Sequence, residues 1–161
     1  MDYLWSPWRM QYINDKENEP QCPFCHALSQ NADKQFLILA RATNAFVMLN
    51  RYPYTSGHLM VLPYQHVPSY ENLSVECRSE IMELLTRATK VIREVYRPNG
   101  FNIGVNIGED AGAGIAEHLH FHIVPRWRGD SNFMSVTAQT RVLPEDLQKS
   151  YQRLKEAWDR E

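Results

Sequence analysis

Three histidines alternate with apolar residues in the segment 117–125, which reads Glu-His-Leu-His-Phe-His-Ile-Val-Pro. Successive side chains of a β-strand point to opposite faces, so a strand here would place all three imidazoles on one face. Each imidazole has polar nitrogens that need partners, and packing three together gives a core no obvious advantage. The pattern therefore predicts a functional cluster of His118, His120 and His122.

The rest of the chain predicts an α+β fold with an antiparallel sheet. Short β-like runs are expected at 36–41, 45–50, 58–63, 101–107 and 118–125. Apolar residues recur at three- and four-residue steps over 81–95, which predicts an amphipathic helix with Ser74 as its N-cap and an end at 98–100. A second helix is expected from about Pro144, with one apolar face made by Leu147, Tyr151, Leu154 and Trp158.

The chain has 161 residues, which fits one domain spanning 1–161. Residues 1–21 read as an aromatic N-terminal extension and residues 140–161 as a helical C-terminal segment.

The net charge of −2 and pI near 6.3 argue against a nucleic-acid partner. No run approaches the roughly 18 apolar residues of a membrane span, and no signal peptide is recognisable. We therefore expect a cytoplasmic protein that binds no membrane.

Two chemistries fit the histidine cluster. One is a metal site, and the other is nucleophilic and acid–base catalysis at a phosphate, which suits imidazole at neutral pH. The loop 104–114, just upstream, is rich in Gly and Ala, so its backbone N–H groups can approach a phosphate closely. This loop favours phosphate chemistry.

The motif His118-x-His120-x-His122, followed by two apolar residues, resembles the signature of the histidine-triad superfamily of nucleotide hydrolases and transferases. The resemblance covers most of the chain. Segments 50–53 and 57–63 look like the strand–turn–strand that precedes the family's long helix. The segments that resemble the branch containing diadenosine tetraphosphate phosphorylases are 4–9, 124–127 and 129–133.

The resemblance implies a five-stranded antiparallel sheet with two main helices, usually a homodimer formed through the long helix, and a small nucleotide as substrate. It implies that His120 attacks the α-phosphate and becomes a nucleotidyl-histidine, while His122 stabilises the developing charge beside His118. The implied nucleotide-binding positions are Asn50 at the ribose, Asn106 and the loop residues Gly112, Ala113 and Gly114 at the phosphates, the auxiliary His58, and the aromatic Trp127.

One position departs from the family pattern. Close relatives carry a polar side chain at the end of the Gly-rich loop, where this chain has Ala113-Gly114. Loss of one such donor can cost about 3–4 kcal/mol of transition-state stabilisation. Either a backbone N–H substitutes, or the substrate and rate differ from the phosphorylase pattern.

Cys22 and Cys25 form a Cys-x-x-Cys, which indicates a metal site or a redox couple. The redox motif normally opens a helix in a thioredoxin-like βαβ pattern, which this sequence lacks. Two thiolates and two imidazoles would complete a tetrahedral Zn²⁺ site, and His66 and His118 are the candidates. The arrangement is similar to that of galactose-1-phosphate uridylyltransferases. Neighbouring His26 is expected at the surface, and the third cysteine, in the long helix, as a small buried residue.

Two further functions stay open. The same triad hydrolyses nucleoside phosphoramidates in related proteins. A triad protein that has lost turnover would instead be a nucleotide-binding module. The sequence favours an enzyme that cleaves a dinucleoside polyphosphate or a related nucleoside phosphate.

Overall fold

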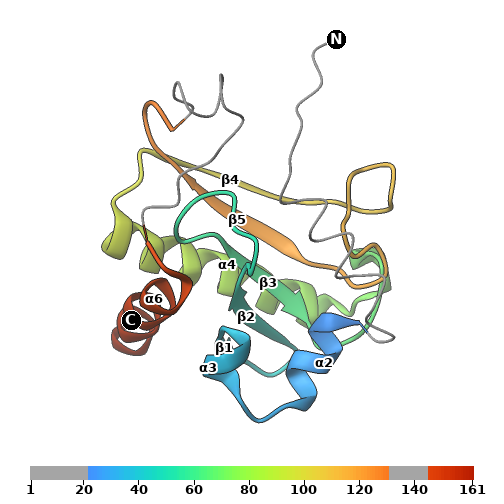
Figure 1. Ribbon diagram of the computed structural model, residues 1–161. Helices are drawn as coiled ribbons and strands as arrows, with labels where there is room; N and C mark the ends of the chain where they lie inside the picture. Colours follow the sequence, from blue (N-terminus) through green and yellow to red (C-terminus); the bar gives the residue numbers. More distant parts are fainter. Residues whose placement is uncertain (1–21, 131–144) are drawn as a thin grey trace.

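The computed structural model describes residues 22–130 and 145–161 (Figure 1). The predicted aromatic extension lies outside these residues, as do residues 140–144 of the C-terminal segment. In chain order the elements are α2 (Pro23–Ser29), α3 (Asp33–Phe36), β1 (Ile38–Arg41), β2 (Ala45–Leu49), β3 (Leu59–Pro63), the 3₁₀-helix η1 (Tyr70–Asn72), α4 (Val75–Tyr96), β4 (Gly100–Val105), β5 (Phe121–Arg126) and α6 (Leu147–Arg160).

The strands form one sheet in the order β1-β2-β3-β5-β4, and each neighbouring pair is antiparallel. The α+β prediction with a five-stranded antiparallel sheet is therefore confirmed. In the pairing of β3 with β5, Met60 lies opposite His122. This register brings His58, which directly precedes β3, beside the histidine segment.

Side chains of the central strands alternate between two apolar layers, as the two-residue period of a strand requires. On β2, Val47 and Leu49 join the large core formed with α4 and α6, whereas Phe46 and Met48 face the smaller cluster around α2. Both faces of the sheet are thus covered, which explains why every residue of β2 and β3 is buried.

The long helix α4 begins and ends where the sequence predicts. The Ser74 side chain accepts a hydrogen bond from the Cys77 backbone N–H, which caps the helix. Arg97 ends it in the left-handed conformation, directly before Pro98. The apolar face packs on β2, β3 and β5 (Figure 1). The buried residues of this face include Ile81, Leu84, Leu85, Ala88, Val91 and Ile92.

Several predicted boundaries were wrong by a few residues. The first strand begins at Ile38 rather than at residue 36, because α3 runs to Phe36 and Leu37 adopts a left-handed φ of 61°. The last strand begins at Phe121 rather than at His118, since residues 111–120 form turns and irregular backbone. The C-terminal helix begins at Leu147, where Asp146 caps it.

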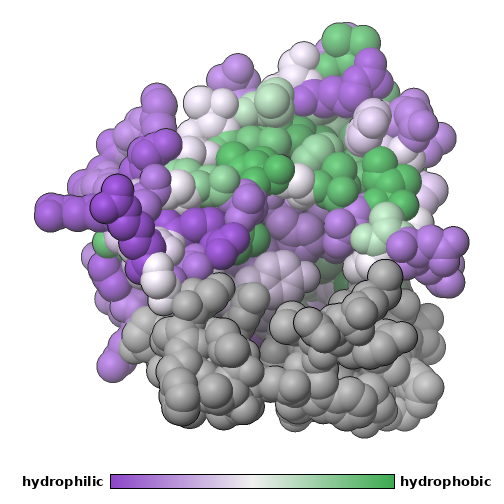
Figure 2. All heavy atoms as spheres, turned by 90° about the horizontal axis from the view of Figure 1, so that it is seen from above, coloured by the Kyte–Doolittle hydropathy of each residue, from purple (hydrophilic) through white to green (hydrophobic). Residues whose placement is uncertain are grey.

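Apolar side chains are exposed along the edge of the sheet formed by β4. Ile103 on this strand and Ile107 just after it are 49% and 38% exposed. Figure 2 looks down on the molecule from above the view of Figure 1, and hydrophobic residues gather on this face.

Among the described ranges, no helix has the length and apolar character to cross a membrane.

Candidate active site and metal centre

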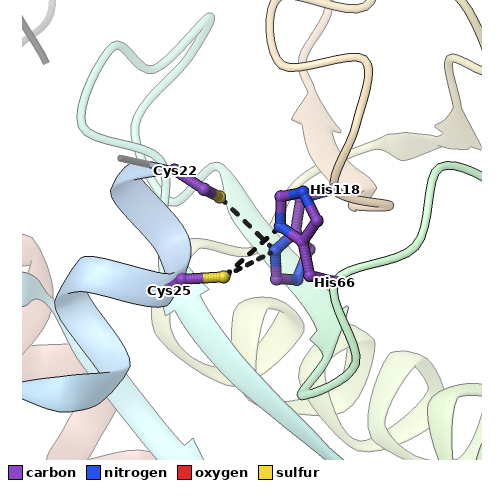
Figure 3. A group of neighbouring side chains, drawn as sticks. All are labelled: Cys22, Cys25, His66 and His118. Carbon is purple, nitrogen blue, oxygen red and sulfur yellow. Dashed lines mark hydrogen bonds between the residues drawn. The ribbon is translucent and has the colours of Figure 1, made fainter. Parts of the chain in front are cut away.

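Four side chains that the sequence singled out as metal ligands lie together at one end of the sheet. Cys22 and Cys25 come from the start of α2, and they point toward His66 and His118 from the opposite side (Figure 3). One ligand atom of each residue lies within 4.8 Å of the others. The predicted ligand set is therefore assembled, although its members are up to 96 residues apart in the chain.

The spacing of the donors fits a tetrahedral ion. Nδ1 of His118 lies 3.5 Å from the Sγ atoms of both Cys22 and Cys25, and Nδ1 of His66 lies 3.4 Å from Cys25 Sγ. With Zn–S bonds of about 2.3 Å and Zn–N bonds of about 2.0 Å, the edge between a sulfur and a nitrogen of a tetrahedron is about 3.5 Å. The residues present therefore fit this metal.

The protonation of His118 also suits a ligand. Its Nε2 lies 3.0 Å from the Pro63 carbonyl oxygen, which can only accept, so Nε2 bears the proton and Nδ1 holds the lone pair. That one lone pair faces two thiols at the same distance and cannot accept well from both. A common ion between the three groups gives each donor a partner.

When no cation is bound, burial disfavours the charged forms of the side chains in this cluster. Burial, together with neighbouring Cys22, raises the pKa of the Cys25 thiol to about 11. Burial also lowers the pKa of His118 to about 4, and the proximity of His66 and His120 adds to this. Metal binding requires a thiolate and a neutral imidazole. The imidazole is already neutral, and a bound cation would stabilise the thiolates.

The candidate nucleophile, His120, is held by the backbone of the candidate ligand. Its Nδ1 lies 2.8 Å from the carbonyl oxygen of His118 and therefore donates to it. The lone pair of the neutral ring is then on Nε2, the nitrogen that is left available to act as a nucleophile. The residue is buried but not sealed, with 5% of its surface exposed. Burial lowers the pKa of His120, which keeps Nε2 unprotonated.

His122 is oriented by a relay that starts at a backbone amide. The Tyr54 N–H donates to Nδ1 of His58 at 3.1 Å, so the proton of neutral His58 is on Nε2. This Nε2 donates to Nδ1 of His122 at 3.0 Å. His122 must then carry its own proton on Nε2, which makes that atom a donor. Burial and nearby His120 lower the pKa of His122 to about 4.

The three triad imidazoles do not share one face of a strand, as the sequence analysis expected. Only His122 lies on β5, and His118 and His120 precede it. The prediction was wrong because it extended strand alternation into irregular backbone. The rings of His120 and His122 nevertheless lie 4.9 Å apart between centroids, whereas the ring of His118 lies 5.1 Å from that of His66.

The predicted nucleotide-binding positions make contacts of their own. The Asn50 side-chain oxygen accepts from the Tyr52 N–H at 2.8 Å, so its amide group remains the donor end of the side chain. Trp127 is half-buried, and its Nε1 donates to the Tyr96 carbonyl at 3.4 Å. Asn106 donates to the Gly112 carbonyl at 3.4 Å and so closes the Gly-rich loop.

Two amides of the Gly-rich loop are already used inside it. The Gly112 N–H donates to the Glu109 carbonyl at 2.8 Å, and the Ala113 N–H donates to the Gly108 carbonyl at 3.3 Å. The suggestion that backbone donors replace the missing side chain at Ala113-Gly114 is therefore not supported for these two amides. Gly108 and Gly112 have positive φ angles of 84°, which the loop geometry requires.

Two aromatic residues of the site were not predicted from the sequence. Phe24, inside the Cys-x-x-Cys, packs against the rings of both His118 and His120, with centroid distances of 5.4 and 5.2 Å. Tyr54 lies 4.7 Å from His58 between ring centroids. Phe24 was detectable only as an apolar residue between two ligands, and Tyr54 only as an aromatic residue in a turn.

The environment of the cysteines differed from the prediction in one respect. Cys22 is the N-cap of α2 and Cys25 lies in its first turn, so the motif does open a helix. The sheet is antiparallel throughout, however, so the thioredoxin-like βαβ context is absent from the described chain. His26 is exposed, and Cys77 is buried, both as predicted.

Comparison with known proteins bears on the family of this chain. The family model described as the HIT domain matches residues 30–129. The AP-4-A phosphorylase of Mycobacterium tuberculosis is 39% identical over 166 residues, which cover 98% of this chain and 85% of that protein. The asymmetrical bis(5'-nucleosyl)-tetraphosphatase of Schizosaccharomyces pombe is 31% identical over 96 residues, 60% of this chain and 51% of that protein.

A solved relative has the same fold. The crystal structure of a zinc-bound histidine triad family protein from Mycobacterium smegmatis has a TM-score of 0.70 and 27% identity, covering 87% of this chain and 94% of that one. The family model spans well over half of the chain, and the mycobacterial phosphorylase aligns with nearly all of it. This protein therefore belongs to the HIT, or histidine-triad, family.

Proposed function

We propose that this protein cleaves a dinucleoside polyphosphate or a related nucleoside phosphate at its α-phosphate, through a covalent nucleotide on His120. The observation that carries the proposal is the hydrogen bond from Nδ1 of His120 to the His118 carbonyl, 2.8 Å long. It leaves a lone pair on Nε2 of a ring that stays neutral. The similarity to the mycobacterial AP-4-A phosphorylase supports a polyphosphate substrate.

The first step is an in-line displacement at phosphorus. Nε2 of His120 forms a bond to the α-phosphorus while the bond from phosphorus to the bridging oxygen breaks. The electron pair of that bond leaves with the departing phosphate. The Nε2–H of His122, oriented by His58, donates a hydrogen bond to the oxygens on which negative charge increases.

The second step restores the enzyme. An oxygen of water or of inorganic phosphate attacks the same phosphorus, the phosphorus–nitrogen bond breaks, and its electron pair returns to Nε2 of His120. The proton of the attacking oxygen passes to solvent. Covalent capture divides one difficult displacement into two easier ones. Water makes the protein a hydrolase, and phosphate makes it a phosphorylase.

The nucleotide would lie between the loop of Asn50 and the Gly-rich loop. The side-chain amide of Asn50 would donate to the ribose hydroxyls, and Asn106, Gly112, Ala113 and Gly114 would border the phosphates. Trp127 would line the site beside His58. The absence of a polar side chain at residue 113 favours catalysis through His122 rather than through a loop donor.

We propose that Cys22, Cys25, His66 and His118 hold a structural Zn²⁺. Four protein ligands leave no coordination position for water or substrate, so the ion would supply a fixed cross-link rather than Lewis-acid chemistry. The cross-link joins the start of α2 to His118, two residues before the candidate nucleophile His120. The zinc-bound relative supports the identity of the ion.

The family expectation of a homodimer through the long helix remains a proposal. Met82 on α4 is 61% exposed, which offers an apolar contact for a second copy. Light scattering of the purified protein should give twice the monomer mass.

Three free thiols in the structure fit a reducing compartment, which supports the expected cytoplasmic location.

One panel of assays tests the activity. Diadenosine tetraphosphate with phosphate, the same substrate without phosphate, and an adenosine phosphoramidate are compared. Product formed only with phosphate identifies a phosphorylase, and preference for the phosphoramidate identifies that hydrolase. Tight nucleotide binding with no product in any assay would identify a binding module and exclude catalysis.

Covalent capture is tested separately. Mass spectrometry of the enzyme quenched during turnover should show one added nucleotidyl group, attached to His120. The variant His120→Asn keeps a polar side chain but cannot form the adduct. If His120→Asn turned over substrate as fast as the parent, the assignment of the nucleophile would be wrong.

A further inference from the structure

Tyr96, the last residue of α4, lies against the turn that precedes His58. A Cβ atom on Gly57 would lie 2.8 Å from Cε2 and 2.9 Å from Cδ2 of the Tyr96 ring, closer than real Cβ contacts. Gly57 also has a φ of 79°, which side chains other than that of glycine rarely adopt. The ring therefore touches the backbone of the turn directly.

The opposite side of Tyr96 is fixed by the start of the C-terminal helix. Its hydroxyl donates to Glu145 Oε2 at 2.6 Å, and the Arg153 guanidinium lies 4.9 Å from the ring centroid. Arg153 also pairs with Glu145 at 2.7 Å. Burial, together with this hydrogen bond, raises the pKa of Tyr96 to about 12, so the hydroxyl stays a donor.

The backbone of Tyr96 contacts the other border of the site, because its carbonyl accepts from Trp127 Nε1 at 3.4 Å. Between the turn and α6 lies a cavity of about 10 Å³, which has room for no more than one water molecule. Its lining includes Asn50, His58 and Glu145. The turn is thus held between Tyr96 and α6 with almost no free volume.

We propose that Tyr96 is a positioning residue of the active site: its ring fixes Gly57 and therefore His58, whose hydrogen bond sets the tautomer of His122. Tyr96 acts through the turn, by the contact of its ring with Gly57. This inference rests on the proposed function for its kinetic consequence. Its structural consequence, the protonation pattern of His122, is independent of any substrate.

Nitrogen NMR of the histidine side chains in nucleotide-free, isotope-labelled protein is the first test. The parent should show His122 with its proton on Nε2 and His120 with its proton on Nδ1. In Tyr96→Leu, the ring no longer supports the turn, so His122 should show a mixture of tautomers. His120 should be unchanged, because the His118 carbonyl holds it independently.

Gly57→Ala tests the same contact from the side of the turn. It is the alternative variant if Tyr96→Leu does not fold. Its added methyl group meets the ring and is also strained at a φ of 79°, so both effects should displace the turn and shift the His122 signals. Introduced into Tyr96→Leu, the same substitution meets no ring, so it should cause less additional change than in the parent. Parent-like His122 signals in both single variants would overturn the proposal.

Kinetics provide the second readout. Displacement of His58 should lower kcat in Tyr96→Leu by about 10-fold to 100-fold, with a smaller change in KM. Tyr151→Leu is the matched control, since Tyr151 belongs to the same core and its hydroxyl also donates a hydrogen bond, to the Ile38 carbonyl at 3.1 Å. It should lower stability but leave kcat and the His122 signals unchanged.

The two failures can be told apart. If the parent turns over no substrate, the proposed activity fails, and the NMR comparison still decides the role of Tyr96. If the parent is active but Tyr151→Leu lowers kcat and alters His122 as much as Tyr96→Leu does, the effect is general loosening of the fold and the positioning role is rejected.

Discussion

Nε2 of His58 lies 3.0 Å from Nδ1 of His122, and this single contact determines which nitrogen of His122 can donate. His58→Phe keeps a ring of similar shape but removes the donor. We expect kcat to fall by about 100-fold, the effect of losing one oriented donor to a transition state. Steady-state kinetics measure it. His26→Phe, at an exposed site, is the control and should keep the parental kcat. An unchanged kcat in His58→Phe would show that the relay has no catalytic role.

Stability should decrease as the pH falls below neutrality. Burial, aided by His120, lowers the pKa of His122 from 6.5 to about 4. The folded protein therefore binds this proton less readily than the unfolded chain, so the contribution is complete above pH 6.5 and is lost progressively toward pH 4. Urea unfolding at steps from about pH 7 to about pH 4.5 measures this decrease. In His122→Gln the decrease should be smaller, and an equal slope would contradict the assignment.

Removal of one thiolate should release the metal. Protein purified without added metal should contain about one equivalent of zinc, and Cys25→Ser less than about a tenth. The free energy of unfolding should fall as well, because the cross-link between α2 and His118 is lost. Cys77→Ser is the matched control, since this buried cysteine lies on α4 outside the ligand cluster. Equal zinc in Cys25→Ser and the parent would exclude the site.

The cap of α4 can be tested without touching either site. Ser74→Ala removes the acceptor for the Cys77 N–H, which is 3.2 Å away, and should cost about 1 kcal/mol of stability. Ser79→Ala lies within the exposed part of the same helix and should be neutral or slightly stabilising, because alanine is the better helix former. Thermal or urea unfolding compares the two. Equal effects would mean that the cap contributes nothing.

Periodicity predicted the elements of this fold well. The three- and four-residue steps after Ser74 located α4, and short β-like apolar runs located β2 and β3 to within one residue at each end. The four candidate metal ligands that the structure brings together were also predicted, because thiolates and imidazoles in such a pattern have few other uses. Helices α2 and α3 were missed, since each is too short to show a helical period.

The site was less predictable where tertiary contacts decide it. Strand alternation placed His118 on β5, but its bond to the Pro63 carbonyl and its contacts with the cysteines hold it in irregular backbone. The partner of His120, the His118 carbonyl, is set by the same irregular backbone, which no sequence pattern indicates. Tyr96 gave no sequence signal, because its contact with Gly57 depends on packing between distant segments.

His118 serves the two centres with two different parts of itself. Its imidazole belongs to the metal cluster, whereas its peptide oxygen, which every amino acid possesses, orients the nucleophile. The side chain at this position can therefore change in evolution without removing the acceptor on which the reactive tautomer depends. The proposed metal site and the proposed phosphate chemistry are adjacent in this molecule yet can be inherited separately.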